Sequence, residues 1–154
     1  TALRRDHYAL FPINPNDLLP EWVGAETVEF GQENGRLSFQ GVAINTPSLL
    51  SGAVIDLTTA WHNETGPQPV KMFIHITNAN EDIVAQWDGL GATWEGWRVG
   101  DRLLQTHKIW VDPTTPPDTY NVWVGLYHPV TFARWQMASG EDRLLLGSIE
   151  IEAP

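Results

Sequence analysis

The feature that most constrains the fold of this chain is an alternation of apolar and polar residues from residue 26 onward. A period of two residues is typical of a half-buried β-strand, because successive side chains point to opposite faces of the sheet. In the clearest stretch, Ile55, Leu57 and Trp61 share one face while Asp56 lies on the other. The alternation recurs in about eight segments, which are 28–30, 37–43, 55–61, 72–77, 83–87, 103–111, 120–126 and 144–151.

These segments predict the fold class. No amphipathic helix of useful length interrupts them, and a parallel α/β fold would need crossover helices. Turn-forming residues separate them at intervals of about 8–12 residues, which is the spacing of a sandwich. We therefore predict an all-β fold, an immunoglobulin-like antiparallel β-sandwich of about 7–9 strands. We expect the core positions of the facing sheets to be largely buried, namely Trp61, Ile74, Val122, Val124 and Leu126.

Proline and glycine mark the predicted connections. Residues 1–25 are rich in proline, which disfavours both a helix and a central strand. We predict an extended lead-in or an interdomain linker there, followed by one sandwich domain over 26–154. As a lead-in, the segment would pack three aromatic residues onto the domain edge: Tyr8, Phe11 and Trp22. Later connections are expected at 47–52 (a turn), 88–101 (a glycine-rich loop) and 128–142 (a hairpin or loop around Phe132 and Trp135).

The charge and the cysteine content exclude several classes of function. The net charge is −10, which repels phosphate backbones and anionic membrane surfaces, so we expect no nucleic-acid partner. The chain has no cysteine, which removes disulfides, thiolate metal sites and cysteine nucleophiles. No apolar run approaches the about 20 residues of a membrane span, so we expect no membrane insertion by this segment. The chain has neither an initiator Met nor a signal peptide, and we expect it to be part of a longer protein or a processed chain.

Three motifs resemble those of a known group of bacterial domains. They are FIHI at 73–76 leading into IVAQWD at 83–88, then WRVGD at 97–101, then PDTYNVWVGLY at 117–127. In this order they are similar to the β-sandwich domain at the C-terminal end of large bacterial membrane proteins that resemble dolichyl-phosphate-mannose-type glycosyltransferases. The resemblance covers 26–152 and implies an extracytoplasmic accessory domain attached to the rest of a larger polypeptide. One departure is Asp118, where the family has glycine.

Single residues in these motifs have predicted structural roles. Tyr120 could act as the corner tyrosine of a sandwich, with its hydroxyl bonded to the backbone of the preceding turn. Gly125 would leave room for a neighbouring side chain or backbone. His75 lies opposite the face shared by Ile74 and Ile76, and we therefore expect it to face solvent or an edge.

No catalytic or metal-binding motif is present. The five histidines occur singly, and the chain has neither a G-x-S-x-G elbow nor an H-E-x-x-H pair. We therefore predict that the domain is not an enzyme, has no catalytic residues and takes no cofactor or metal. A loop calcium site built from Asp88, Asp101 or Asp112 with backbone carbonyls is left open by the sequence.

The predicted ligand-binding residues lie in the glycine-rich loop. Trp94 and Trp97 would stack on sugar rings, while the carboxylates of Asp88 and Asp101 would accept hydroxyl protons. The alternative is that both rings are hydrophobic plugs. That alternative is favoured for Trp97, and the two interpretations are balanced for Trp94.

Three hypotheses for the function follow. The first is a non-catalytic extracytoplasmic accessory domain of a larger, membrane-anchored glycosyltransferase-like protein. The second is a carbohydrate-binding module, whose partner would be a glycan. The third is a protein-binding module, such as a proteinase inhibitor, because small sandwiches also serve that role.

Overall fold

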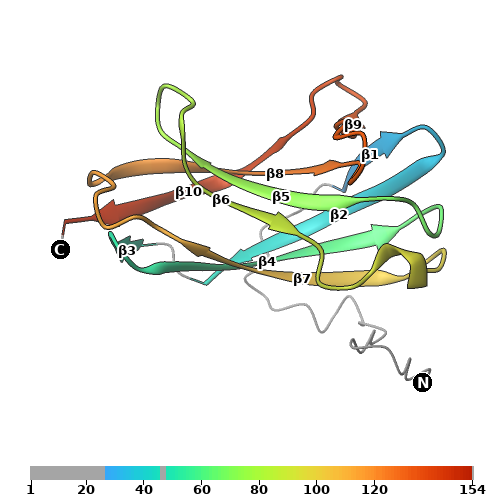
Figure 1. The fold of residues 1–154 in the computed structure, drawn as a ribbon, viewed down its shortest axis with the longest axis horizontal. Coiled ribbons are helices and arrows are strands. Elements are labelled where there is room, and N and C mark those ends of the chain that lie inside the picture. Colours follow the sequence, from blue (N-terminus) through green and yellow to red (C-terminus); the bar gives the residue numbers. More distant parts are fainter. Residues whose placement is uncertain (1–26, 46–47, 154) are drawn as a thin grey trace.

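The computed structural model describes residues 27–45 and 48–153, which form a sandwich of two β-sheets (Figure 1). The strands of the described residues are β1 (Val28–Gln32), β2 (Gly35–Ile44), β3 (Ser48–Leu50), β4 (Val54–Asn63), β5 (Lys71–Thr77), β6 (Ile83–Gly89), β7 (Arg102–Trp110), β8 (Asp118–Tyr127), β9 (Gln136–Met137) and β10 (Leu144–Glu152). A single-turn 3-10 helix, η2 (Trp94–Gly96), precedes β7. Within the described ranges, no helix is long and apolar enough to cross a membrane.

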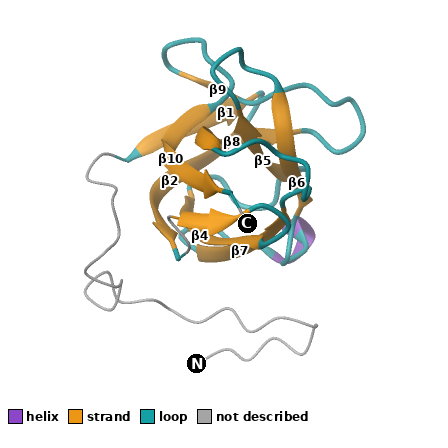
Figure 2. Ribbon diagram, turned by 90° about the vertical axis from the view of Figure 1, so that its left-hand side faces the viewer, coloured by secondary structure: helices purple, strands orange, loops and turns teal. Residues whose placement is uncertain are grey.

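Each sheet has five strands. The first has the order β7-β4-β2-β1-β9, and the second has the order β3-β10-β8-β5-β6. The pairings are antiparallel except that of β3 with β10. In Figure 2 the strands surround a common interior. The prediction of an all-β antiparallel sandwich is confirmed, while its immunoglobulin-like character stays a prediction.

The expected core residues lie where the alternation predicts. Trp61 of β4 and four residues of β5 and β8 are 0% exposed, namely Ile74, Val122, Val124 and Leu126. Trp61 also packs against Phe39 of the adjacent β2 and against Phe30 of β1, one strand further along the same sheet. Fully burying such side chains stabilises the fold by about 1.5–3 kcal/mol each. The core prediction is therefore confirmed.

Some boundaries differ from the sequence-based expectation. The segment predicted as a turn at 47–52 contains β3, and the segment 128–142 contains β9. Strands of two or three residues are too short to show a period, and they exist because of tertiary pairing with β10 and β1. The predicted lead-in 1–25 lies outside the described residues, as do Tyr8, Phe11 and Trp22 within it.

The connection between β8 and β10 covers part of the outer face of the second sheet. The guanidinium of Arg134 lies 4.1 Å from the ring centroid of Phe73, and that ring is only 1% exposed. His75 stacks against Phe73 at 4.5 Å and is 8% exposed. The expectation that His75 faces solvent is therefore wrong, because residues far along the chain fold over it. Such a layer leaves no periodic signal within the strand itself.

Gly125 and Tyr120 have the predicted structural roles. A Cβ atom at Gly125 would overlap the ring of Phe73 and lie 2.7 Å from the carbonyl oxygen of Asp142. Gly125 therefore permits both Phe73 and the returning chain to lie against β8. The hydroxyl of Tyr120 donates a hydrogen bond of 2.7 Å to the carbonyl of Pro116. This bond ties the preceding turn to the start of β8, as in a tyrosine corner.

We predict that Gly125→Ala destabilises the domain by about 1–3 kcal/mol, because the new methyl group overpacks the site. The measurement is the free energy of unfolding in urea. Gly91→Ala is the control, since this residue is exposed and its Cβ would meet only the amide end of the Gln105 side chain. The control should lose less than about 1 kcal/mol. Equal losses for the two variants would contradict the packing described for β8.

A buried polar group joins β4 and β7. The Nε2 atom of His107 lies 2.9 Å from the hydroxyl of Thr59, which accepts a hydrogen bond of 2.8 Å from the Trp61 indole. The imidazole meets Trp87 edge to face at 4.3 Å, which links the two sheets where β6 lies beside β7. Nδ1 has no hydrogen-bond partner among the described residues. Burial lowers the pKa of His107 to about 3, so the ring is neutral in the folded state.

We predict that the stability of the domain falls as the pH falls through the histidine range. The unfolded chain takes up a proton near the ordinary pKa of 6.5, whereas folded His107 does not until about 3. Stability is therefore complete above pH 6.5 and is lost below it, by about 1.4 kcal/mol for each unit between the two pKa values. Burial also lowers the pKa of His75, which adds in the same direction.

Urea unfolding at about pH 7 and about pH 5 tests this linkage. In His107→Gln the free energy of unfolding should depend less steeply on pH, because the glutamine amide keeps a hydrogen-bonding group but does not titrate. Parallel stability curves for wild type and His107→Gln would contradict a neutral buried imidazole.

Candidate binding site

The two tryptophans predicted to bind a ligand are both packed onto the sandwich. Trp97 is 4% exposed and belongs to the hydrophobic core, which is the plug arrangement favoured above for this residue. Trp94, in η2, is partly buried against the same core. A ring that is buried in the core offers no face to a sugar, so the structure leaves Trp94 as the more accessible of the two.

The two aspartates of the same prediction have other surroundings. The carboxylate of Asp101 accepts a hydrogen bond of 2.7 Å from the backbone of Arg98 and closes the turn before β7. Asp88 lies near the end of β6, opposite Phe73 of β5. Burial and the nearby Asp88 carboxylate raise the pKa of Tyr127. Whether any of the four residues binds a ligand stays a prediction. Within the part of the chain that the structure describes, no group of three or more His, Asp or Glu could hold a metal ion.

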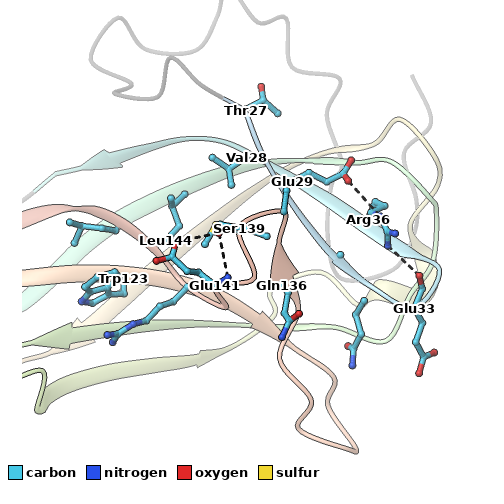
Figure 3. Close-up of a pocket in the computed structure, with 16 residues that line it drawn as sticks. Thr27, Val28, Glu29, Glu33, Arg36, Trp123, Gln136, Ser139, Glu141 and Leu144 are labelled. Carbon is cyan, nitrogen blue, oxygen red and sulfur yellow. Dashed lines mark hydrogen bonds and ion pairs between the residues drawn. The ribbon is translucent and has the colours of Figure 1, made fainter.

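A groove of about 890 Å³ opens elsewhere, where β1 and β9 of the first sheet approach β8 and β10 of the second (Figure 3). The polar residues of its described lining are Thr27, Glu29, Gln32, Glu33, Arg36, Gln136, Ser139, Glu141 and Arg143. Its larger apolar side chains are Val28, Trp123, Met137, Leu144 and Leu145. The groove thus combines hydrogen-bonding groups with apolar surface, which is the composition of a ligand site.

Incomplete strand pairing explains why a groove forms at this side. β9 pairs with β1 only at Phe30 and Gly31 among the described residues. β3 pairs with β10 only at Glu150–Glu152, and the described residues provide no neighbour on that side for the first half of β10. No described pairing joins β1 to β10. Side chains therefore line the space between the two sheets.

Arg36 shapes one end of the groove. Its Nη1 donates hydrogen bonds to the carbonyls of Gly35 at 2.7 Å and Glu33 at 3.2 Å, and its Nε lies 3.5 Å from the Glu29 carboxylate. These contacts hold the turn between β1 and β2, where Glu33 has a φ of +50°. Arg36 therefore orders both Glu29 and the backbone that presents Glu33.

Arg143 and Trp123 form the opposite end. The guanidinium of Arg143 lies 4.0 Å from the ring centroid of Trp123 and also bonds the Glu81 carboxylate at 3.0 Å. The indole of Trp123 donates a hydrogen bond of 2.9 Å to the hydroxyl of Thr77. A cation–π contact of this kind contributes about 0.5–1 kcal/mol at a partly exposed site. The two residues fix the wall where the groove meets the outer face of the second sheet.

The aromatic layer beneath that wall continues along the sheet. His75 pairs with Trp123 across the strands and stacks on Phe73. Burial lowers the pKa of His75, and the charges of Arg134 and Arg143 lower it further, while Asp88 and Asp142 act in the opposite direction. The neutral ring packs among the other aromatic groups without requiring a counter-ion.

The remaining polar side chains of the groove are suited to hydrogen bonding with a ligand. Glu33, Gln32 and Gln136 make no side-chain hydrogen bond within the described ranges, and Glu141 contacts Ser139 at 3.3 Å. Carboxylates accept protons from hydroxyl groups, and amides both donate and accept. An open space with such a lining fits a hydroxyl-rich ligand.

Sequence reasoning missed this groove because its residues come from segments 27–36, 123 and 136–145. The lining mixes polar and apolar residues and includes consecutive pairs such as Val28 with Glu29 and Leu144 with Leu145, so it follows neither half of the alternation. Only the pairing of the two-residue β9 with β1 brings the segments together. The clustering of glutamine and glutamate at 29–33 and 136–141 is the one sequence signal that could have suggested it.

Comparisons with known proteins support the fold. No protein-family model and no curated protein matches the chain, so neither supports the resemblance to a glycosyltransferase-like parent. Among solved structures, the chain is similar to one described as the crystal structure of the C-terminal domain of Wzt. The TM-score is 0.55 and the identity 15%, over 88% of this chain and 81% of that one. At this identity the likeness shows a shared β-rich fold alone and says nothing about activity.

Proposed function

We propose that this chain is a non-catalytic domain that binds glycan in the groove between β1, β9, β8 and β10. The observation that carries the proposal is the lining of the groove, in which carboxylate and amide side chains share one open space with the Trp123 side chain. Sugar hydroxyls need such acceptors and donors, and apolar side chains contact the C–H faces of the rings. Within the described ranges, no cluster of His, Asp or Glu indicates metal-assisted chemistry.

The domain would belong to a larger polypeptide that acts outside the cytoplasm. The similar solved structure is itself described as a C-terminal domain, which agrees with a part of a longer chain. The three motifs of the second half would make the parent a glycosyltransferase-like membrane protein. The complete gene tests this part of the proposal: membrane-spanning segments upstream of Thr1 are expected, and a parent without them would contradict it.

The binding proposal predicts that a polysaccharide array retains the domain and that Gln136→Ala/Glu141→Ala lowers the affinity at least about tenfold, as expected for about 1.4 kcal/mol. The melting temperature should stay nearly constant, because both side chains are exposed. The matched control is Gln40→Ala/Glu150→Ala, which removes the same two residue types outside the groove.

Trp94→Ala separates this site from the loop predicted by the sequence. We expect Trp94→Ala to retain glycan, with the melting temperature lowered by a few degrees because the ring packs on the core. If Trp94→Ala lost glycan binding while Gln136→Ala/Glu141→Ala bound normally, the binding site would lie in the loop and not in the groove. Absence of retention by any polysaccharide would end the glycan-binding proposal.

A further inference from the structure

We propose, on the basis of the proposed function, that the groove takes an uncharged, hydroxyl-rich glycan and rejects acidic polysaccharides. The first argument is the charge of the lining. The carboxylates of Glu29, Glu33 and Glu141 stand against the guanidinium groups of Arg36 and Arg143, and the described residues of the lining include no lysine or histidine. The charge balance of these described residues is negative, so an anionic chain that enters the groove meets net repulsion from them.

The second argument is that Arg36 is already engaged. Acidic sugars are recognised most strongly when a guanidinium pairs with the carboxylate through two parallel hydrogen bonds. The Nη1 of Arg36 bonds two backbone carbonyls, and its Nε faces Glu29. A bidentate pair with a ligand would break the contacts that hold the turn between β1 and β2. Arg36 is thus a positioning residue for its neighbours and not an anion receptor.

Arg143 is engaged in the same way. One face of its guanidinium covers Trp123, and Nη2 bonds Glu81 from the turn between β5 and β6. The side chain is only 23% exposed, which limits its approach to a ligand. Of the described residues that line the groove, the two cations are therefore not presented to a ligand carboxylate.

The third argument concerns the groups that are presented. Gln32 and Gln136 offer amides, while Glu33 and Glu141 offer carboxylate oxygens. These acceptors outnumber the available donors, and a ligand that supplies many O–H donors satisfies them. A chain of neutral sugars does so, whereas each uronate group replaces a donor by a charged acceptor. The net charge of −10 on the whole protein acts in the same direction.

The test begins with an array that holds neutral and acidic polysaccharides, followed by a chemical exchange of charge on the polysaccharide that is retained. A neutral hit is oxidised at its primary hydroxyls to carboxylates, and an acidic hit is reduced to its alcohol. We expect the array hits to be neutral and their oxidation to weaken retention at least about tenfold. Retention should change less than about twofold between about 0.02 M and about 0.3 M NaCl, because no ion pair carries it.

Charge variants of the protein provide the second measurement. Glu33→Lys/Glu141→Lys makes the net charge of the groove lining positive and should allow retention of the oxidised polysaccharide. Arg36→Gln should still reject the oxidised polysaccharide. Preferential retention of acidic polysaccharides by the wild type, with loss in Arg36→Gln or Arg143→Gln, would overturn the inference while leaving glycan binding intact. Failure of the whole array would instead overturn the proposed function on which it rests.

Discussion

The contact between Phe73 and Gly125 is the constraint on which the outer part of this domain depends. It occurs on the outer face of the second sheet, where a side chain on Gly125 would overlap the aromatic ring. The guanidinium of Arg134 lies 4.1 Å from the centroid of this ring, and the chain at Asp142 passes close to Gly125. Packing at one glycine thus anchors the connection that leaves β8 and returns as β10.

That connection makes the groove. Between its two anchored ends, the chain crosses to the first sheet and forms β9 at the edge of β1. The segment that contains β9 supplies one wall of the groove, and the hairpin of β1 and β2 supplies another. The contact between Arg143 and Trp123 closes one end of the groove. The engaged arginines order the walls, and under the proposed function the amides and two of the carboxylates would meet the ligand. Folding stability and ligand recognition would then be divided between different side chains.

The sequence predicted the interior of the domain better than its surface. Alternation places Trp61, Val122 and Val124 in the core because burial of one strand face is a local, periodic property. The environment of His75 depends on residues about sixty positions away, and no local pattern encodes it. The groove was missed for the same reason, since β9 exists only through pairing with β1. The plug interpretation favoured for Trp97 agrees with its burial, whereas the sequence left Trp94 undecided and the structure places it as partly buried.

The most direct test of the groove is a map of backbone amide shifts by NMR as an oligosaccharide from a retained polysaccharide is added. The account predicts that the largest shifts fall in β1, in β9 with the turn after it, and at the start of β10. The loop that contains Trp94 should change little. Shifts confined to residues 90–101, with β1 and β9 unchanged, would contradict the account and place recognition on the other side of the sandwich.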